Sequence, residues 1–353
     1  MNKFLTTAAV AVSLGLASQA NAAVTVYKDD KSSVSVGGYV KLDARHQDGD
    51  LAFRRYFIGN NPGAVDTSET RLYANESRLQ FKVQHEEVTG VIEIDFDTAE
   101  GNEVATNSHG ARIRHAFIKY KNWTVGQNWS TFMPLHALSE TLDFGGPHVG
   151  QVFIRQAQIR YTSGGWSFAV ENPHTFGGGN SGSSQESMVD LIGRYDFKGD
   201  WGQASVGGLV RKVDQSGIDE TAAAVNVAAK IKVGDKNDIR FQVSLGEYGR
   251  YAGTTAVPDV AVDAEGEVQV EDGTSYTLSY RHFWNETTRS TIYIGGSDAD
   301  VSGQDRQHWG ANVITNLTPK LRTGIEVGRY TVSDNLPTDL SSNYVQLSAV
   351  FAF

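Results

Sequence analysis

The chain ends with Asn343–Phe353, NYVQLSAVFAF, in which every second side chain is apolar. The residues on the apolar face are Val345, Leu347, Ala349, Phe351 and Phe353. A period of two indicates a β-strand with one apolar face. A soluble domain usually ends in polar, loosely ordered residues, so the question is what this apolar face contacts.

The same alternation recurs through the chain. In SRLQFKVQH (77–85) and IRFQVSL (239–245), apolar residues alternate with Arg, Gln, Lys and Ser. Short turns such as SGGW and KGDW separate some strands, whereas longer polar segments, for example 48–70, 173–186, 214–222 and 250–273, separate others. Short turns at one end and long loops at the other are typical of outer-membrane barrels, and the pattern from Val34 to Phe353 predicts about 16 strands.

The predicted fold class is therefore all-β, a transmembrane antiparallel β-barrel. The last strand must pair with the first, near 34–47, because open sheet edges are not tolerated in hydrocarbon. The apolar face of 343–353 then faces lipid. An even strand number places both termini at the end that carries the short turns.

The N-terminus predicts export. Met1–Ala22, MNKFLTTAAVAVSLGLASQANA, has Lys3, a short apolar run and an Ala20-Asn21-Ala22 cleavage site. These are the parts of a secretory signal peptide. We expect a signal peptide at 1–22, one barrel domain at 23–353, and location in the bacterial outer membrane.

Composition excludes several classes of function. The 353 residues contain no Cys, which excludes disulfides, thiolate metal sites and cysteine nucleophiles. The formal net charge of −10 argues against a nucleic-acid partner. Neither G-x-S-x-G nor H-E-x-x-H occurs, so no enzyme, metal site or cofactor is predicted.

Aromatic residues cluster at predicted strand ends, as interfacial girdles require. They are Trp123, Trp166, Tyr195, Phe197, Trp201, Tyr280, Trp284 and Tyr344. The alternative is that they are ordinary aromatics on a soluble sheet. His282 lies among them and is interpreted as a girdle histidine.

The segment STFMPLHALSETLDFGGPHVGQ, 130–151, is too apolar for an exposed loop. We expect it to fold into the lumen and form a constriction; packing at a subunit interface is the alternative. The candidate lining of the pore and constriction combines polar-face cations with a few other polar groups. These residues are Arg78, Lys82, Arg112, Arg114, Arg155, Gln158, Arg160, Arg194, Glu140 and Asp143.

Arginines that line a narrow pore select anions and suit carboxylates. The alternative is that lumen acids pair with them and leave weak selectivity. Further cations at inward positions are Arg211, Lys230, Arg240, Arg281 and Arg322. The acidic excess falls in long loops such as 258–272. This loop is predicted to be a solvated face. The alternatives are that it binds a divalent cation or screens the entry of solutes to the pore.

Several stretches together resemble the DcaP-like trimeric porins of Gram-negative outer membranes. They are GGYVKLDA (37–44), ARIRHAFIKYKNWTVGQNWSTFM (111–133), DFGGP (143–147), RQAQIRYT (155–162) and ENP (171–173). The resemblance implies a sixteen-stranded barrel, a homotrimer and uptake of small anions such as dicarboxylates. It maps the constriction to 130–151 and its basic lining to Arg112, Arg114, Arg155 and Arg160. Only about ten residues separate Ala23 from the first predicted strand, so a coiled-coil extension carried by some members is not expected.

The predicted function is passive diffusion of small anionic solutes, and the resemblance implies dicarboxylates. The alternatives are a general, weakly selective porin, or an adhesin or receptor scaffold without transport. The expected partners are outer-membrane lipid and lipopolysaccharide, the barrel-assembly machinery through Phe353, and further copies of the chain in a homotrimer. Poor alternation over Arg112–Tyr120 is a further hint that this wall faces a subunit.

Overall fold

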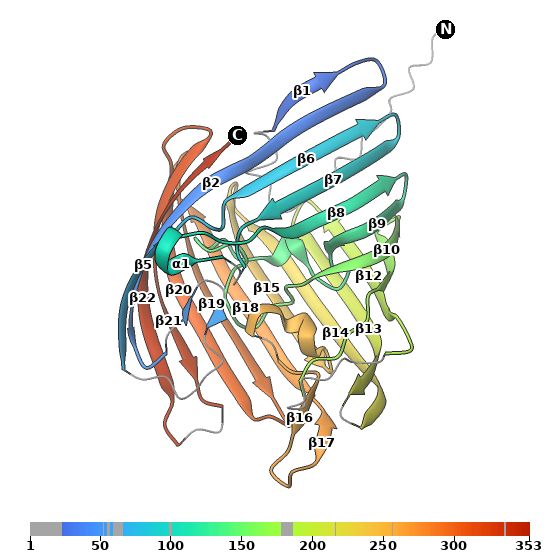
Figure 1. The fold of residues 1–353 in the computed structure, drawn as a ribbon, viewed down its shortest axis with the longest axis vertical. Helices are drawn as coiled ribbons and strands as arrows, with labels where there is room; N and C mark the ends of the chain where they lie inside the picture. The colour runs from blue at the N-terminus through green and yellow to red at the C-terminus, as the bar shows by residue number, and fades with distance from the viewer. Residues whose placement is uncertain are drawn as a thin grey trace.

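The computed structural model describes residues 23–51, 53–54, 57–58, 66–98, 101–177, 186–215, 217–255, 257–334 and 337–353. The predicted signal peptide at 1–22 lies outside these residues. Figure 1 shows a closed barrel of tilted antiparallel strands, with both labelled termini at the same end. Within the described residues, no helix combines the length and apolar character needed to cross a membrane.

The described residues form a wall of sixteen strand positions, which confirms the predicted fold class. In wall order the strands are β2 (Ser32–Gly49), β5 (Thr67–Tyr73) with β6 (Arg78–His85), β7 (Val88–Asp95), β8 (Arg112–Tyr120), β9 (Trp123–Trp129), β10 (Arg155–Ser163), β11 (Trp166–Glu171), β12 (Asp190–Gly199), β13 (Gly202–Gln215), β14 (Ile218–Val233), β15 (Asn237–Gly246), β18 (Gly273–Phe283), β19 (Thr288–Ala299), β20 (Gln304–Asn316), β21 (Leu321–Val332) and β22 (Leu340–Ala352). Strands β5 and β6 share one position because both pair with β2.

The remaining elements are short and lie in or beside the loops. They are β1 (Val24–Lys28), β3 (Phe53–Arg54), β4 (Phe57–Ile58), β16 (Val260–Val262), β17 (Val268–Val270), the helix α1 (Glu103–Thr106), and the 3₁₀ helices η1 (Leu135–Ala137) and η2 (Gly249–Thr255).

The barrel closes between its first and last strands, as predicted. Strand β2 pairs with β22 from Tyr39 opposite Ala352 to Gly49 opposite Ser342. Gly38 and Phe353 then exchange both backbone hydrogen bonds, at 3.2 and 3.1 Å. The segment before the first predicted strand also forms a strand: β1 pairs with the start of β2 and continues the line of β22.

The outer face carries the apolar half of each alternating strand. Leu347 and Phe351 of β22 are 54% and 48% exposed, whereas Gln346 and Ser348 between them are buried. Aromatic rings form the predicted girdle at the short-turn end, where Trp166 stacks on Phe168 at 5.6 Å. Tyr344 is an exception to the prediction, because its even position on β22 turns it into the lumen, where it is 6% exposed.

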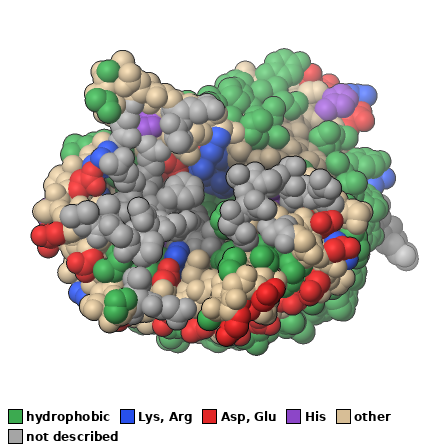
Figure 2. Space-filling view, turned by 60° about the horizontal axis from the view of Figure 1, so that its bottom comes forward, with side chains coloured by type: hydrophobic (Ala, Val, Ile, Leu, Met, Phe, Trp, Pro, Cys, Tyr) green, Lys and Arg blue, Asp and Glu red, His purple; other side chains and the backbone are tan. Residues whose placement is uncertain are grey.

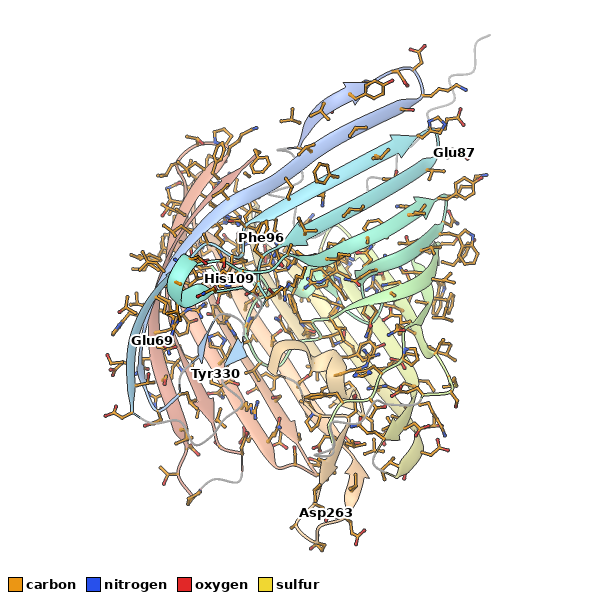
Figure 3. The ribbon with its side chains drawn as sticks, in the orientation of Figure 1. Glu69, Glu87, Phe96, His109, Asp263 and Tyr330 are labelled. Atoms are coloured by element: carbon orange, nitrogen blue, oxygen red, sulfur yellow. The ribbon has the colours of Figure 1, made fainter. Side chains whose placement is uncertain are left out.

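The two ends of the barrel differ as expected. Glu87 lies in a short turn at one end, and Asp263 lies at the tip of the β16–β17 hairpin at the other (Figure 3). We call these the short-turn end and the long-loop end. The segment 214–222 was wrongly predicted as a loop: β13 and β14 continue to Gln215 opposite Ile218. There, Val213 and Ala222 pack on Val260, which stabilises the extended hairpin.

The broken alternation over Arg112–Tyr120 has a local cause. The pairing of β7 with β8 shifts register between Glu93 and Ile94, because Glu93 lies opposite His115 and Ile94 lies opposite Ile113. Arg114 is the extra residue of this β-bulge. The broken pattern therefore reflects a bulge and is not by itself a sign of a subunit contact.

Strand length divides the wall in two. Strands β7 to β11 have only six to nine residues each. Strands β13, β14 and β18 to β22 have eleven to sixteen. We call the part formed by β7 to β11 the short wall.

Candidate functional site

The segment between β9 and β10, residues 130–154, lies inside the barrel, as predicted for 130–151. We call it the inner loop. Its side chains Phe132, Met133, Val149 and Val152 are fully buried. Phe132, Met133 and Val152 pack in one cluster with small or apolar inward residues of β11 to β14, namely Ala169, Ile192, Leu209 and Ala224, whereas Val149 packs in a second cluster with Tyr330 and Tyr344. The loop folds inward because the wall offers an apolar surface for its apolar residues.

A second segment, around η2, helps to fill the lumen. The ring of Tyr251 meets Phe132 edge to face at 5.8 Å, and its backbone oxygen accepts the Phe153 N–H at 3.1 Å. The Tyr251 hydroxyl donates to Asp190 at 2.8 Å, which fixes η2 to the wall. Sequence reasoning missed this contact; the closely spaced Tyr248 and Tyr251 were the available signal.

The outgoing half of the inner loop crosses the lumen and is held at each step. Its Leu138 carbonyl accepts from Arg240 of β15. The Leu142 N–H donates to Glu326 of β21 at 2.9 Å. Asp143 then forms a buried ion pair with Arg45 of β2. The loop therefore reaches from β15 to the closing seam of the barrel.

The returning half is held by side chains that accept backbone N–H groups. The His148 N–H donates to His308 Nδ1 at 2.9 Å. The Val152 N–H donates to Gln242 Oε1 at 3.1 Å. Since His308 Nδ1 accepts here, the proton of its neutral ring lies on Nε2, which is 3.0 Å from the Tyr344 hydroxyl. Both halves of the loop are thus fixed against the wall.

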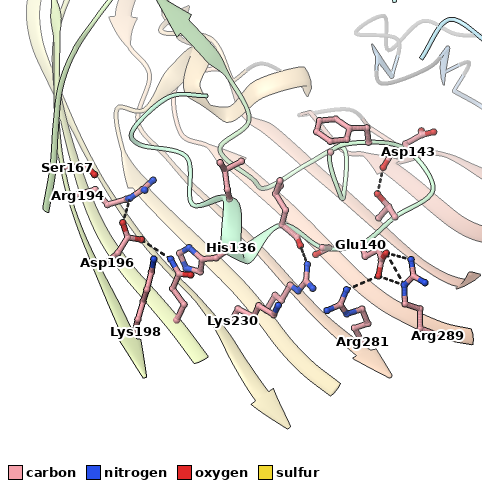
Figure 4. A pocket seen from close by; sticks show the side chains of 18 of the residues that line it. His136, Glu140, Asp143, Ser167, Arg194, Asp196, Lys198, Lys230, Arg281 and Arg289 are labelled. Atoms are coloured by element: carbon pink, nitrogen blue, oxygen red, sulfur yellow. Dashed lines mark hydrogen bonds and ion pairs between the residues drawn. The ribbon is translucent and has the colours of Figure 1, made fainter. Parts of the chain in front are cut away.

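A water-accessible cavity of about 1530 Å³ lies between the inner loop and the short-turn end. Its charged lining contains eleven Lys and Arg but only four Asp and Glu. The cations are Lys41, Lys119, Lys121, Arg160, Arg194, Lys198, Lys230, Arg240, Arg281, Arg289 and Arg322, and the acids are Glu76, Glu140, Asp143 and Asp196. Figure 4 shows part of this lining, with Arg194, Lys230, Arg281 and Arg289 on the wall and Glu140 on the loop.

The long-loop end has the opposite character. Figure 2 shows Asp and Glu side chains along its rim and a recess between the loops with Lys and Arg inside. The acidic hairpin formed by β16 and β17 projects at this end, and its Asp263 accepts the backbone N–H groups of Glu265 and Glu267 at 3.0 and 2.8 Å. The acidic segment 258–272 is therefore partly structured and holds its own turn.

Four of the predicted lining residues border the cavity: Arg160, Arg194, Glu140 and Asp143. The Arg160 backbone pairs with β9 and β11, but its guanidinium forms no ion pair or hydrogen bond with any part of the chain that the structure describes. Arg194 donates to Asp196 at 3.1 Å and to the loop carbonyls of Thr131 and Met133 at 2.8 Å. The unpaired guanidinium of Arg160 is thus the predicted cation best placed to meet a solute.

The other predicted residues lie away from this cavity. Arg112 and Arg114 both contact Asp95, at 2.7 Å, and Arg78 lies 3.7 Å from Glu93. These arginines are used in a charge network on the inner face of the wall. Their place in the pore lining stays a prediction, and their ion pairs fit the alternative in which lumen acids pair with the cations.

Arg155, Gln158 and Lys82 also lie outside the cavity lining. The Arg155 guanidinium lies 4.5 Å from the centre of the Trp129 ring. Because Arg155 and Arg160 are five residues apart on β10, the alternation places them on opposite faces of the strand. Gln158 bonds the Trp129 carbonyl and the Thr131 hydroxyl at 2.8 and 3.1 Å, so it supports the start of the inner loop. Lys82 is an exposed residue of β6.

Sequence reasoning missed five cavity cations, namely Lys41, Lys119, Lys121, Lys198 and Arg289. Lys41, Lys198 and Arg289 each stand at an inward-facing position of an alternating strand, so the alternation was the available signal. Their common level in the barrel depends on strand tilt and register, which the pattern of one strand does not define.

Burial and ion pairs change the protonation of loop residues. Guanidinium groups of Arg289 and Arg281 outweigh burial and hold the pKa of Glu140 well below its usual range. Arg45 does the same for the pKa of Asp143. Burial lowers the pKa of His136 to about 4, so its ring is neutral at pH 7. At neutral pH the loop therefore presents the carboxylates of Glu140 and Asp143 together with an uncharged His136.

One acidic cluster has the composition of a cation site. Oxygens of Asp43, Glu76 and Asp143 lie within 4.8 Å of one another. However, the Lys41 ammonium bonds Glu76 and lies 3.2 Å from Asp43, while Arg45 binds Asp143. The chain's own cations therefore satisfy these carboxylates, and the cluster anchors the inner loop.

Known structures share this fold. The outer membrane channel DcaP of Acinetobacter baumannii matches with a TM-score of 0.79 and 20% identity, covering 94% of this chain and 100% of that one. An anion-selective porin from Comamonas acidovorans matches with a TM-score of 0.61 and 13% identity, covering 92% and 100%. OmpF of Salmonella typhi, solved with daunomycin, gives 0.58 and 13%, covering 94% and 100%.

A search of curated protein sequences finds no match to this chain. The sequence profile of the porin subfamily, in contrast, matches residues 32–349, which include every strand of the wall except the last residues of β22. Such barrels are channels of the bacterial outer membrane, and the lumen described above has the inward loop and charged cavity that a channel requires. The chain belongs to the porin subfamily and is a multi-pass β-barrel of the outer membrane.

Proposed function

We propose that this porin passes small anionic solutes, with dicarboxylates as its preferred class. The observation that carries the proposal is the excess of eleven cations over four acids around the cavity beside the inner loop. Charges of one sign on low-dielectric walls concentrate counter-ions and exclude ions of the same charge. The anion-selective porin of the same fold from Comamonas acidovorans supports this proposal.

The proposed mechanism is diffusion through water past the inner loop. Guanidinium groups replace part of the hydration of a carboxylate, and their fork geometry suits its two oxygens. Arg160 is available for this contact because it has no ion pair within the described residues. Binding at each cation must stay weak so that a solute leaves as readily as it enters.

A weakly selective general porin is the second candidate, because many lumen cations are already neutralised. Asp238 alone lies 2.6 Å from both Arg240 and Arg281, and Asp196 lies 3.1 Å from Arg194. Each such pair reduces the field that a passing ion experiences. The remaining excess of cations favours the anion-preferring alternative.

We further propose a homotrimer in which the short wall is the subunit contact. A β-strand needs about 9–11 residues to cross a bilayer at a tilt of about 45°. Three of the five short-wall strands have fewer than nine residues. The outward side chains of the short wall nevertheless include Ile92 of β7 and Ile113 and Ile118 of β8, which are 54–57% exposed. A second copy covers such a surface without requiring it to span lipid.

The other proposed partners act on the outer surface. The long apolar wall and its girdle suit membrane lipid and lipopolysaccharide. Phe353, whose backbone completes the closing seam at Gly38, is proposed to be the residue that the barrel-assembly machinery reads.

Liposome swelling tests the transport proposal. Vesicles that contain the purified protein should swell faster in disodium succinate than in an isotonic salt of a divalent organic cation of similar size. Equal rates in both would favour the general porin. Absence of swelling in either, with correctly inserted protein, would contradict any channel function and favour a surface scaffold.

A further inference from the structure

The carboxylate of Glu140 lies in the most basic part of the cavity. It accepts from Nε and Nη2 of Arg289 at 2.7–3.0 Å and from Nη1 of Arg281 at 3.0 Å (Figure 4). This arrangement of two guanidinium groups around two oxygens is the one a carboxylate solute would adopt. The inner loop therefore supplies to the wall a group of the same chemistry as the proposed solute.

The surrounding charge exceeds what Glu140 can neutralise. Lys230 and Arg322 lie within electrostatic reach of its carboxylate. Arg240 lies beside Lys230, and Asp238 is a second acid of the group. Glu76 also lies within electrostatic reach of Arg322, so five cations face three carboxylates, and the position stays attractive to a further anion.

The Glu140 side chain is not needed to hold the loop in place. The Glu140 carbonyl accepts from Asn312 at 2.9 Å. Two residues later, Lys41 donates to the Leu142 carbonyl at 2.8 Å and the Leu142 N–H donates to Glu326 at 2.9 Å. The backbone on both sides is therefore fixed, while the Glu140 side chain, 18% exposed, borders the cavity. Rotation of this side chain would free Arg289 without moving the loop.

We infer that Glu140 is a tethered competitor: its carboxylate occupies the Arg281–Arg289 position in the resting pore, and a permeating carboxylate takes that position by displacing it. This inference rests on the proposed anion passage. Its consequence is kinetic. An internal carboxylate that returns to the arginines weakens solute binding and so prevents the solute from being retained. Glu140 is then a specificity-determining residue that sets how tightly carboxylates bind.

The test compares three variants in planar bilayers by measuring the succinate concentration that half-saturates the conductance. Glu140→Gln removes the competing charge, and we expect it to lower this concentration about tenfold, the effect of freeing one charge-assisted contact. Glu140→Asp keeps a competing carboxylate and should stay within about threefold of the native value. Arg289→Gln removes a ligand of the site and should raise the concentration.

Arg289→Gln is the control for a loosened loop, because it breaks the same loop-to-wall contact as Glu140→Gln. Opposite shifts in the two variants support the tethered competitor. Shifts in the same direction, or no shift in Glu140→Gln, overturn it and leave Glu140 as a loop anchor. If the native pore shows no anion preference and no saturation by succinate, the proposed function itself fails, which is a distinguishable result.

Discussion

Arg45 of β2 and Asp143 of the inner loop form an ion pair inside the barrel, with only 4% and 6% of their side chains exposed. Gln346 of β22 donates to the same carboxylate at 2.7 Å. One loop residue is therefore bound to both strands that close the barrel. The bore of the pore depends on this attachment, because the loop crosses the lumen to reach it.

Replacing Asp143 with Asn should loosen the inner loop. Breaking a buried ion pair costs about 3–5 kcal/mol, because the remaining charge is left without its partner. We expect a larger and noisier single-channel conductance. Lys31→Gln is the control, since Lys31 and Glu86 form a pair that is 69% and 56% exposed and should contribute little. Native-like conductance in the Asp143 variant would contradict the attachment.

Replacing Arg160 with Gln should reduce the preference for anions. Its guanidinium has no ion pair within the described chain, so no acid is freed when its charge is removed. The reversal potential in a salt gradient should move toward zero. Lys236→Gln, on an exposed short turn where Lys236 pairs with Glu286, is the control and should leave it unchanged. An equal effect of the two substitutions would exclude a special role for Arg160.

Acid should weaken the docking of the inner loop in two steps. The pKa of His136 is lowered to about 4 in the docked loop, against about 6.5 for a free imidazole. A released loop thus binds a proton that the docked loop does not, so docking weakens as pH falls from about 6.5 to 4. The pKa values of Glu140 and Asp143 are lowered, so their contribution is present at neutral pH and is lost only in stronger acid.

Current noise of the open channel between pH 7 and pH 4.5 measures this effect. It should rise in the native protein and stay nearly constant in His136→Gln, whose side chain does not titrate. Noise that is independent of pH in the native protein would show that His136 does not report loop docking.

The short wall predicts different outcomes for two similar outward residues. Ile92 of β7 is 54% exposed on the short wall, and Ile292 of β19, one of the longer strands outside the short wall, is 62% exposed. Ile92→Asn should dissociate the oligomer in native electrophoresis, because it places a polar group in the subunit contact. Ile292→Asn should leave the oligomer intact. Dissociation by Ile292→Asn alone would place the contact on the other wall.

Much of the fold could be predicted from the sequence because each strand carries its own pattern. The alternation in 343–353 determines which side chains face outward, and closure follows because hydrocarbon does not tolerate a free edge. The apolar composition of 130–151 indicated burial, because apolar side chains are removed from water when the chain folds. The failures are positions where a neighbour changes the local rule: the bulge at Arg114, or the support that Val260 gives to the extended β13–β14 hairpin.

The site was harder to predict because charge alone does not show which cations remain free. Arg112 and Arg160 both occur in strands rich in cations, but only the Arg112 guanidinium pairs with an aspartate, Asp95. That difference depends on which strands are neighbours and at what register. Likewise, the sequence shows that Glu140 is acidic but not that the loop carries it to Arg281 and Arg289, 141 and 149 residues away.

The most direct test of the central claim is the reversal potential of the native protein in a planar bilayer under a potassium chloride gradient. An excess of cations around the cavity predicts a potential that favours chloride over potassium, with the preference decreasing as salt screens the lumen charges. A potential that favours potassium, or one that stays at zero at low salt, would contradict the anion-preferring pore.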